Sequence, residues 1–189
     1  ALLAQARTDE QLFRAVVLVD VTPRMELGGV QRIVGFMAAH PDGFDSLDAA
    51  SAIIAEYTGR PRPLTPDGLR QVLAHGSDGR WRWRWDVRFL EGRADMIIGG
   101  DIEALREIQV RERLHEGARR IKVPALVVRG AESDLVSTEG VREFVDAVPG
   151  AQYVDVADAG HMVAGDQNDT FTAAVLTFLS EVRTGTTRR

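Results

Sequence analysis

Two strand-and-loop segments in the last third of the chain constrain its fold most strongly. An apolar run, Val123-Pro-Ala-Leu-Val-Val-Arg-Gly130, leads into Ala-Glu-Ser-Asp134. A second run, Gln152-Tyr-Val-Asp-Val156, leads into Ala-Asp-Ala-Gly-His161. In an open parallel sheet, the loops that follow the carboxyl ends of the strands carry the functional side chains. The sequence therefore predicts an α/β fold with an acid and a histidine beyond the ends of two strands.

A third strand is predicted near the start of the chain. Residues 12–19, Leu-Phe-Arg-Ala-Val-Val-Leu-Val, form a continuous apolar run of the kind found in parallel strands that are buried on both faces. Pro23 prevents the strand from continuing much further. Helices are predicted at 101–120, 138–147 and 168–182, so the last part of the chain alternates strands with helices.

The middle of the chain has a different pattern, typical of an inserted helical module. Apolar residues recur at helical spacing in 30–39, 46–57 and 65–75. A strictly alternating Trp and Arg segment, 80–86, is predicted to be extended, with the tryptophans on one side and the arginines on the other. We therefore divide the chain into a first core segment (1–24), a helical insertion (25–100) and a second core segment (101–189).

The predicted sheet needs more strands than these residues supply. An all-parallel sheet must be covered on both faces, and three strands are too few to build one. The chain also begins at Ala1 with residues that resemble the end of a helix without an N-cap. We therefore expect an N-terminal portion of the same protein to complete the fold.

Composition excludes several classes of protein. Hydrophobic residues make up 44% and charged residues 27% of the 189 residues, as in ordinary globular domains. The net charge of −5 argues against a nucleic-acid or anionic-membrane partner, although Trp and Arg could stack on bases. There is no cysteine, which excludes disulfides and thiolate sites and is compatible with a cytoplasmic location. No apolar run approaches the roughly 20 residues of a membrane span.

The loops ending in Asp134 and Gly160-His161-Met162 resemble the acid and histidine loops of the α/β-hydrolase family, in that family's chain order. The resemblance implies the second half of an α/β-hydrolase sheet with an inserted cap. It implies His161 as the catalytic base and Asp134 as its orienting acid, without a metal or other cofactor. Asp20 is the alternative acid, since some relatives carry it after the preceding strand.

The family's nucleophile motif is absent from the sequence. It is a Gly-x-Ser-x-Gly turn between a strand and a helix, and no such pattern occurs in these 189 residues. We therefore expect the nucleophile to lie upstream of Ala1 and the 189 residues to be inactive alone. The tryptophan segment resembles the cap of bacterial hydrolases, which implies that one of its aromatic residues faces a small-molecule substrate. Trp83 and Trp85 are the candidates from this segment, and Met162, beside His161, is a further candidate.

Several reactions stay open at this point because the nucleophile is unknown. A serine would favour hydrolysis of a small, largely apolar ester or lactone, whereas an aspartate would favour an epoxide hydrolase. Cofactor-free haloperoxidases and perhydrolases share the serine triad. A non-catalytic binding protein of the same fold is the alternative from another functional class.

Overall fold

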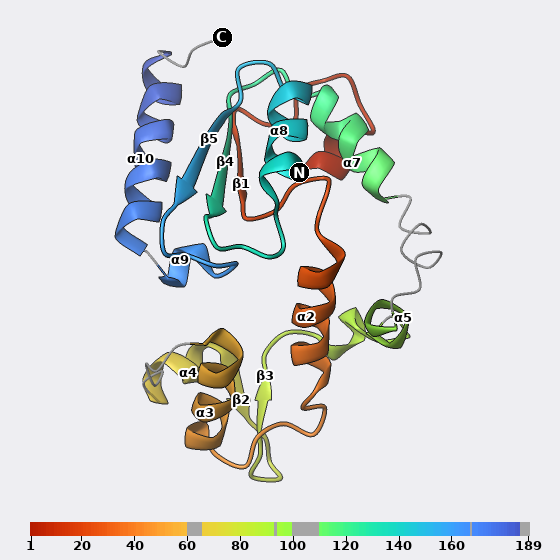
Figure 1. The fold of residues 1–189 in the computed structure, drawn as a ribbon, viewed down its shortest axis with the longest axis vertical. Helices are drawn as coiled ribbons and strands as arrows, with labels where there is room; N and C mark the ends of the chain where they lie inside the picture. The colour runs from red at the N-terminus through yellow and green to blue at the C-terminus, as the bar shows by residue number, and fades with distance from the viewer. Residues whose placement is uncertain (60–65, 93, 100–109, 167, 186–189) are drawn as a thin grey trace. The chain divides into compact units, whose positions relative to one another are not determined.

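The computed structural model describes residues 1–59, 66–92, 94–99, 110–166 and 168–185. The chain forms two compact units (Figure 1). The first contains residues 1–30 and 100–189, and the second contains residues 31–99. Each unit has its own core, and the two are described separately below.

The first unit is built around a parallel three-stranded sheet. Its strands are β1 (Val16–Val19), β4 (Ala125–Gly130) and β5 (Gln152–Val156), in the order β1-β4-β5. Val16 of β1 is level with Ala125 of β4, and Leu126 of β4 is level with Gln152 of β5. The parallel α/β sheet predicted from the sequence is confirmed, although the first strand begins at Val16 rather than at residue 12.

Helices cover both faces of this sheet. Figure 1 shows α8 (Thr138–Ala147) and α10 (Asn168–Thr184) on opposite sides of the three strands. Phe178 of α10 packs with Leu126 and Val128 of β4, and all three are buried. All six residues of β4 are buried, as expected for the central strand of a covered parallel sheet. The unit also contains α1 (Leu2–Gln5), α7 (Val110–Arg119) and α9 (Val163–Asp166).

The predicted helices of the first unit match the structure where it is described. The helix at 138–147 has the predicted bounds, and it begins after Ser137, whose hydroxyl accepts a hydrogen bond from the Gly140 N–H at 3.2 Å. The helix predicted at 168–182 extends to Thr184. The helix predicted at 101–120 is present as α7, and residues 101–109 lie outside the described part of the chain.

The second unit combines helices with a short hairpin. Helix α2 (Leu27–Ala38) enters it, and α3 (Leu47–Thr58) and α4 (Pro66–Val72) follow. Strand β2 (Leu73–His75) pairs antiparallel with β3 (Trp81–Trp83), and η1 (Val87–Phe89) and α5 (Ala94–Ile98) complete the unit. None of the helices described in either unit is long and apolar enough to cross a membrane.

The hairpin corrects one prediction. Residues 73–75 were predicted to end a helix, but they form β2 because Leu73 pairs with Trp83 across the hairpin. Leu73 is fully buried with Phe44 and Leu69, and Trp81 and Trp83 pack against the same cluster. The spacing of Leu69 and Leu73 is typical of a helix, but these residues belong to α4 and β2. Both side chains are buried in the same core, which explains why both positions are apolar.

Candidate active site

The loop after β5 brings His161 back to the end of the sheet. The Ala131 N–H donates to the Val156 carbonyl at 2.9 Å, and the Glu132 N–H donates to the Ala159 carbonyl at 2.9 Å. These bonds join the loop after β4 to the loop after β5.

Gly130 permits this close contact between the two loops, because a Cβ on this residue would lie 2.1 Å from the Gly160 carbonyl oxygen.

Asp20 is the carboxylate that contacts His161. It follows β1 directly, its side chain is fully buried, and its Oδ2 lies 2.8 Å from the His161 Nδ1. Its backbone φ is +46°, a left-handed value that non-glycine residues adopt at a cost and that is found more often at functional sites. The Asp20 N–H still pairs with the Val128 carbonyl at 2.7 Å, so the end of β4 fixes where this residue lies.

The Asp20 carboxylate accepts two further hydrogen bonds. The Gly130 N–H donates to Oδ1 at 3.1 Å, and the Ser133 hydroxyl donates to Oδ2 at 2.7 Å. Burying a carboxylate is costly unless donors replace the lost water, and here three groups do so. Asp20, Ser133 and His161 thus come from the ends of three adjacent parallel strands.

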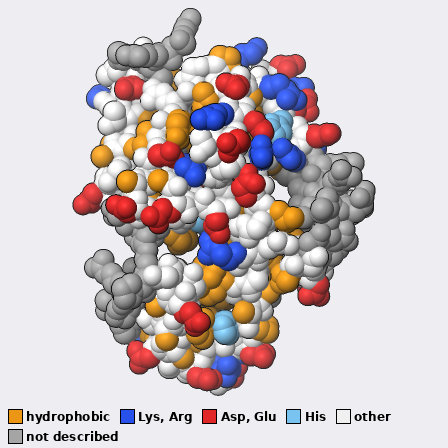
Figure 2. Space-filling view, viewed as in Figure 1, with side chains coloured by type: hydrophobic (Ala, Val, Ile, Leu, Met, Phe, Trp, Pro, Cys, Tyr) orange, Lys and Arg blue, Asp and Glu red, His pale blue; other side chains and the backbone are white. Residues whose placement is uncertain are grey.

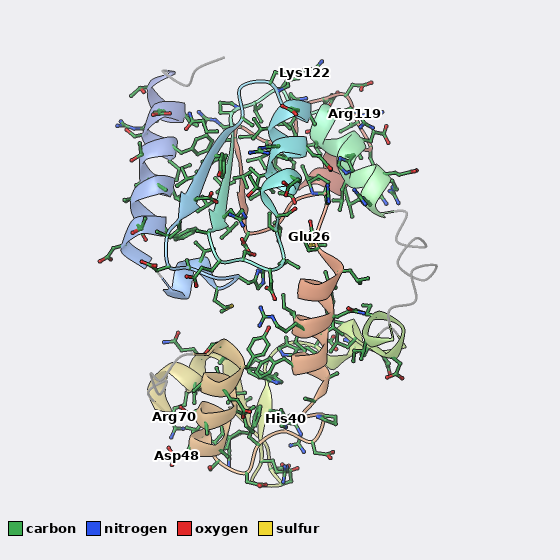
Figure 3. All side chains as sticks on the ribbon, viewed as in Figure 1. Glu26, His40, Asp48, Arg70, Arg119 and Lys122 are labelled. Atoms are coloured by element: carbon green, nitrogen blue, oxygen red, sulfur yellow. The ribbon has the colours of Figure 1, made fainter. Side chains whose placement is uncertain are left out.

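The prediction that Asp134 contacts the imidazole Nδ1 is wrong, because Asp20 occupies that position. Asp134 lies further along the loop, where its backbone packs on the start of α2. A Cβ on Gly29 would lie 2.4 Å from the Asp134 carbonyl oxygen. The N–H of Glu26, labelled in Figure 3, donates to the Leu135 carbonyl at 2.8 Å. The loop is therefore held against α2 at this point, and the Asp134 side chain is exposed.

His161 is more accessible than its partner. Its side chain is 28% exposed, whereas that of Asp20 is 0% exposed. Met162, the next residue and a predicted substrate contact, is 59% exposed. A reactant could thus approach the imidazole without reaching the carboxylate behind it.

Trp83 and Trp85, the other predicted substrate contacts, lie in the second unit. Both line a hollow of about 340 Å³, together with Met37, Leu90 and His40, which Figure 3 labels. The buried indole N–H of Trp83 has no hydrogen-bond partner within the described residues. Whether this hollow receives a substrate stays a prediction.

Two arginines of this segment are paired with acids, whereas the Arg84 guanidinium donates to the Arg70 carbonyl at 3.3 Å. Arg80 contacts Asp45 at 2.5 Å, and Arg82 binds both oxygens of Asp78 at 2.8 and 2.6 Å. The Arg82 guanidinium holds the pKa of the Asp78 carboxyl well below its usual range. On the face drawn in Figure 2, Lys and Arg side chains are likewise interspersed with Asp and Glu.

Known proteins resemble this chain in sequence and in fold. Residues 105–188 match the TAP-like protein family. A 3-hydroxybutyrate-oligomer hydrolase from Cupriavidus necator is 28% identical over 159 residues, which cover 78% of this chain and 50% of that protein. The chain therefore spans about half the length of this curated relative.

Solved structures show the same fold. The structure of E-2-(acetamidomethylene)succinate hydrolase superposes with a TM-score of 0.67 at 23% identity, covering 95% of this chain and 62% of the other. An α/β hydrolase from Novosphingobium aromaticivorans gives a TM-score of 0.67 at 22% identity, with coverages of 95% and 60%. An esterase from Mycobacterium tuberculosis gives 0.63 at 22% identity, with coverages of 94% and 57%.

The parallel sheet and these matches define the fold. The chain has an α/β-hydrolase fold, as its acid and histidine loops predicted, and its relatives are hydrolases. It carries part of that fold, since it covers about three fifths of the hydrolase structures that it matches.

Proposed function

We propose that these residues are the C-terminal portion of an α/β hydrolase that cleaves a small, largely apolar ester or lactone. Asp20 and His161 are its acid–base pair, and its nucleophile lies upstream of Ala1. The contact of 2.8 Å between Asp20 Oδ2 and His161 Nδ1 carries the proposal. Without such a carboxylate, an imidazole has no fixed tautomer or orientation for proton transfer.

Each residue of the pair has a distinct task in this reaction. The Asp20 carboxylate accepts the Nδ1–H, so the opposite nitrogen, Nε2, is unprotonated and serves as the base. Nε2 removes the proton from the nucleophile as that group attacks the substrate carbonyl, and donates it to the departing alcohol. Nε2 then takes a proton from the water that attacks the acyl group, and returns it to the nucleophile as the acid is released. While the imidazole carries the extra proton, the negative charge of Asp20 stabilises it.

The substrate is proposed to contact the exposed side of this pair. Met162 follows His161 in the chain and is exposed. Trp83 and Trp85 are proposed separately as substrate contacts, within the hollow that they line in the second unit. An apolar lining with few polar groups is typical of small-molecule sites. The name of the C. necator relative makes oligomers of 3-hydroxybutyrate a reasonable first substrate to test.

The N-terminal portion of the same protein is the proposed partner of this chain. In the described sheet β1 pairs with β4 alone, so its other edge is available for a further strand. We also propose a cytoplasmic location, with which a sequence without cysteine is compatible.

The experiment uses the protein translated from the full reading frame. We expect it to hydrolyse members of a panel of p-nitrophenyl esters, lactones and 3-hydroxybutyrate oligomers. A fluorophosphonate probe, which labels activated serines, should modify a residue upstream of Ala1. Replacing His161 with alanine should abolish turnover and labelling while leaving the circular dichroism spectrum unchanged, because the histidine carries the proton.

Other outcomes would assign another function. Turnover of epoxides without probe labelling would indicate an aspartate nucleophile. Halide-dependent oxidation by peroxide, with no turnover of the esters or lactones, would indicate a haloperoxidase or perhydrolase. A folded protein with no turnover and no labelling would be a non-catalytic binding protein. Each of these results would contradict the proposed ester or lactone hydrolysis.

A further inference from the structure

We propose that Ser133 is a positioning residue of the site, whose hydroxyl holds the Asp20 carboxylate in the orientation that His161 requires. The inference rests on the proposed function, because it assigns a role beside the acid–base pair. Ser133 was not among the residues that the sequence predicted for the site. Its neighbour Asp134 was predicted instead.

The hydrogen bonds around Asp20 show what Ser133 contributes. Its hydroxyl lies 2.7 Å from Asp20 Oδ2, the oxygen that also contacts His161 Nδ1 at 2.8 Å. The other oxygen, Oδ1, is held by the Gly130 N–H. Since one oxygen is held by the last residue of β4 and the other by the loop that follows, the carboxylate cannot rotate about χ2 without breaking a hydrogen bond. Without Ser133, the imidazole would be the one remaining partner of Oδ2 among the side chains that the structure describes.

The direction of the Ser133 hydrogen bond follows from its other partners. A serine hydroxyl has one proton to donate and two lone pairs to accept with. Its oxygen accepts from the N–H groups of Leu135 and Val136, both at 3.2 Å. Both lone pairs are therefore used, and the single proton points to Asp20. The hydrogen bond to a charged acceptor is also stronger than one between neutral groups.

Arg129 fixes the loop on both sides of Ser133. Its side chain is 10% exposed, and its guanidinium donates to the Val136 carbonyl at 2.6 Å and to the Ala131 carbonyl at 3.3 Å. A third contact, at 2.9 Å, joins the guanidinium to Asp155 of β5. Ser133 therefore sits in a loop tied to the sheet, so its position relative to Asp20 is set by the fold.

The test compares variants of the full-length protein. In Ser133→Ala, we expect kcat to fall on the order of tenfold with KM nearly unchanged, because a hydrogen bond to a charged group has been lost. The Nδ1–H proton resonance of His161, assigned by its loss in His161→Ala, should move upfield or exchange faster. Ser133→Thr keeps the hydroxyl and should restore both readouts. Ser133→Cys, a weaker donor of similar shape, should lie between them and covers the case in which the alanine variant does not fold.

Ser137→Ala is the matched control. Ser137 lies in the same loop and caps α8, so its loss should lower the melting temperature without changing kcat or the resonance. Ser133 variants that behave like this control would overturn the inference, because the hydroxyl would then support only the loop. The resonance is measured without substrate, so it tests Ser133 even if the protein hydrolyses nothing and the proposed function fails.

Discussion

At the scale of single residues, the site depends on close backbone contacts as much as on its polar side chains. Gly130 ends β4, donates its N–H to Asp20, and lies against the carbonyls of Ala159 and Gly160. Any side chain at this position would push the histidine loop away from the sheet. The distance between Asp20 and His161 is therefore set partly by a residue that has no side chain.

Replacing Gly130 with alanine tests this dependence. The new Cβ would lie 2.1 Å from the Gly160 oxygen, which no Cβ tolerates, so the histidine loop must move. We expect a loss of about 1–3 kcal/mol in the free energy of unfolding, as for overpacked sites, together with a large drop in kcat. Urea denaturation and steady-state kinetics would measure both.

Gly35→Ala is its control. Gly35 lies inside α2, and a Cβ there would meet no heavy atom within 4 Å among the described residues, apart from the adjacent backbone of its own helix. Alanine should stabilise the helix by roughly 0.5–1 kcal/mol without affecting kcat. Equal effects of the two substitutions would refute the role given to Gly130.

At the scale of elements, the ends of the strands could be predicted better than the paths of the loops. The strand before His161 and the helix at 138–147 follow from local patterns of apolar residues and a serine cap. The choice between Asp20 and Asp134 depends on contacts far apart in the sequence, such as that of Gly29 with the Asp134 carbonyl. The strand at Leu73 was missed for the same reason, since its partner Trp83 lies beyond a turn.

Arg129 offers a prediction about the loop after β4. Arg129→Met keeps a long side chain but removes the donors to the Val136 and Ala131 carbonyls and leaves Asp155 without this cation. We expect the free energy of unfolding to fall by about 2–4 kcal/mol, since buried acceptors lose their partner. Thermal unfolding followed by circular dichroism measures this change.

Arg88→Met provides the comparison. Arg88 makes an ion pair with Asp86 at 2.5 Å, but its side chain is 78% exposed, so water replaces the lost contact. Little change in the melting temperature is expected. A similar loss in both variants would show that the contacts of Arg129 with the loop are not what stabilises it.

At the scale of the whole molecule, the exposed edge of β1 governs how these residues behave alone. β1 pairs with β4 on one side, and the described residues place no strand on the other. Buried apolar residues such as Val16 and Leu18 lie along this edge strand. An unprotected edge of this kind pairs readily with other chains.

Expression of residues 1–189 alone tests this expectation. We expect insoluble or molten material that binds a hydrophobic dye and lacks a cooperative thermal transition, whereas the longer protein should unfold cooperatively. Differential scanning calorimetry and dye binding distinguish the two states. A monomer of these residues with a sharp transition would show that β1 needs no further strand.

The central claim is that Asp20, and not Asp134, is the acid that serves His161. The most direct measurement is kcat of Asp20→Asn and Asp134→Asn in the full-length protein, with His161→Ala as the reference for lost catalysis. Asp20→Asn should lower kcat by a factor on the order of 10⁴, as replacement of the triad aspartate by asparagine does in serine proteases, because an amide favours the wrong tautomer of the histidine. Asp134→Asn should leave kcat close to that of the unchanged protein, since its side chain is exposed. A large loss in Asp134→Asn with little change in Asp20→Asn would contradict the account.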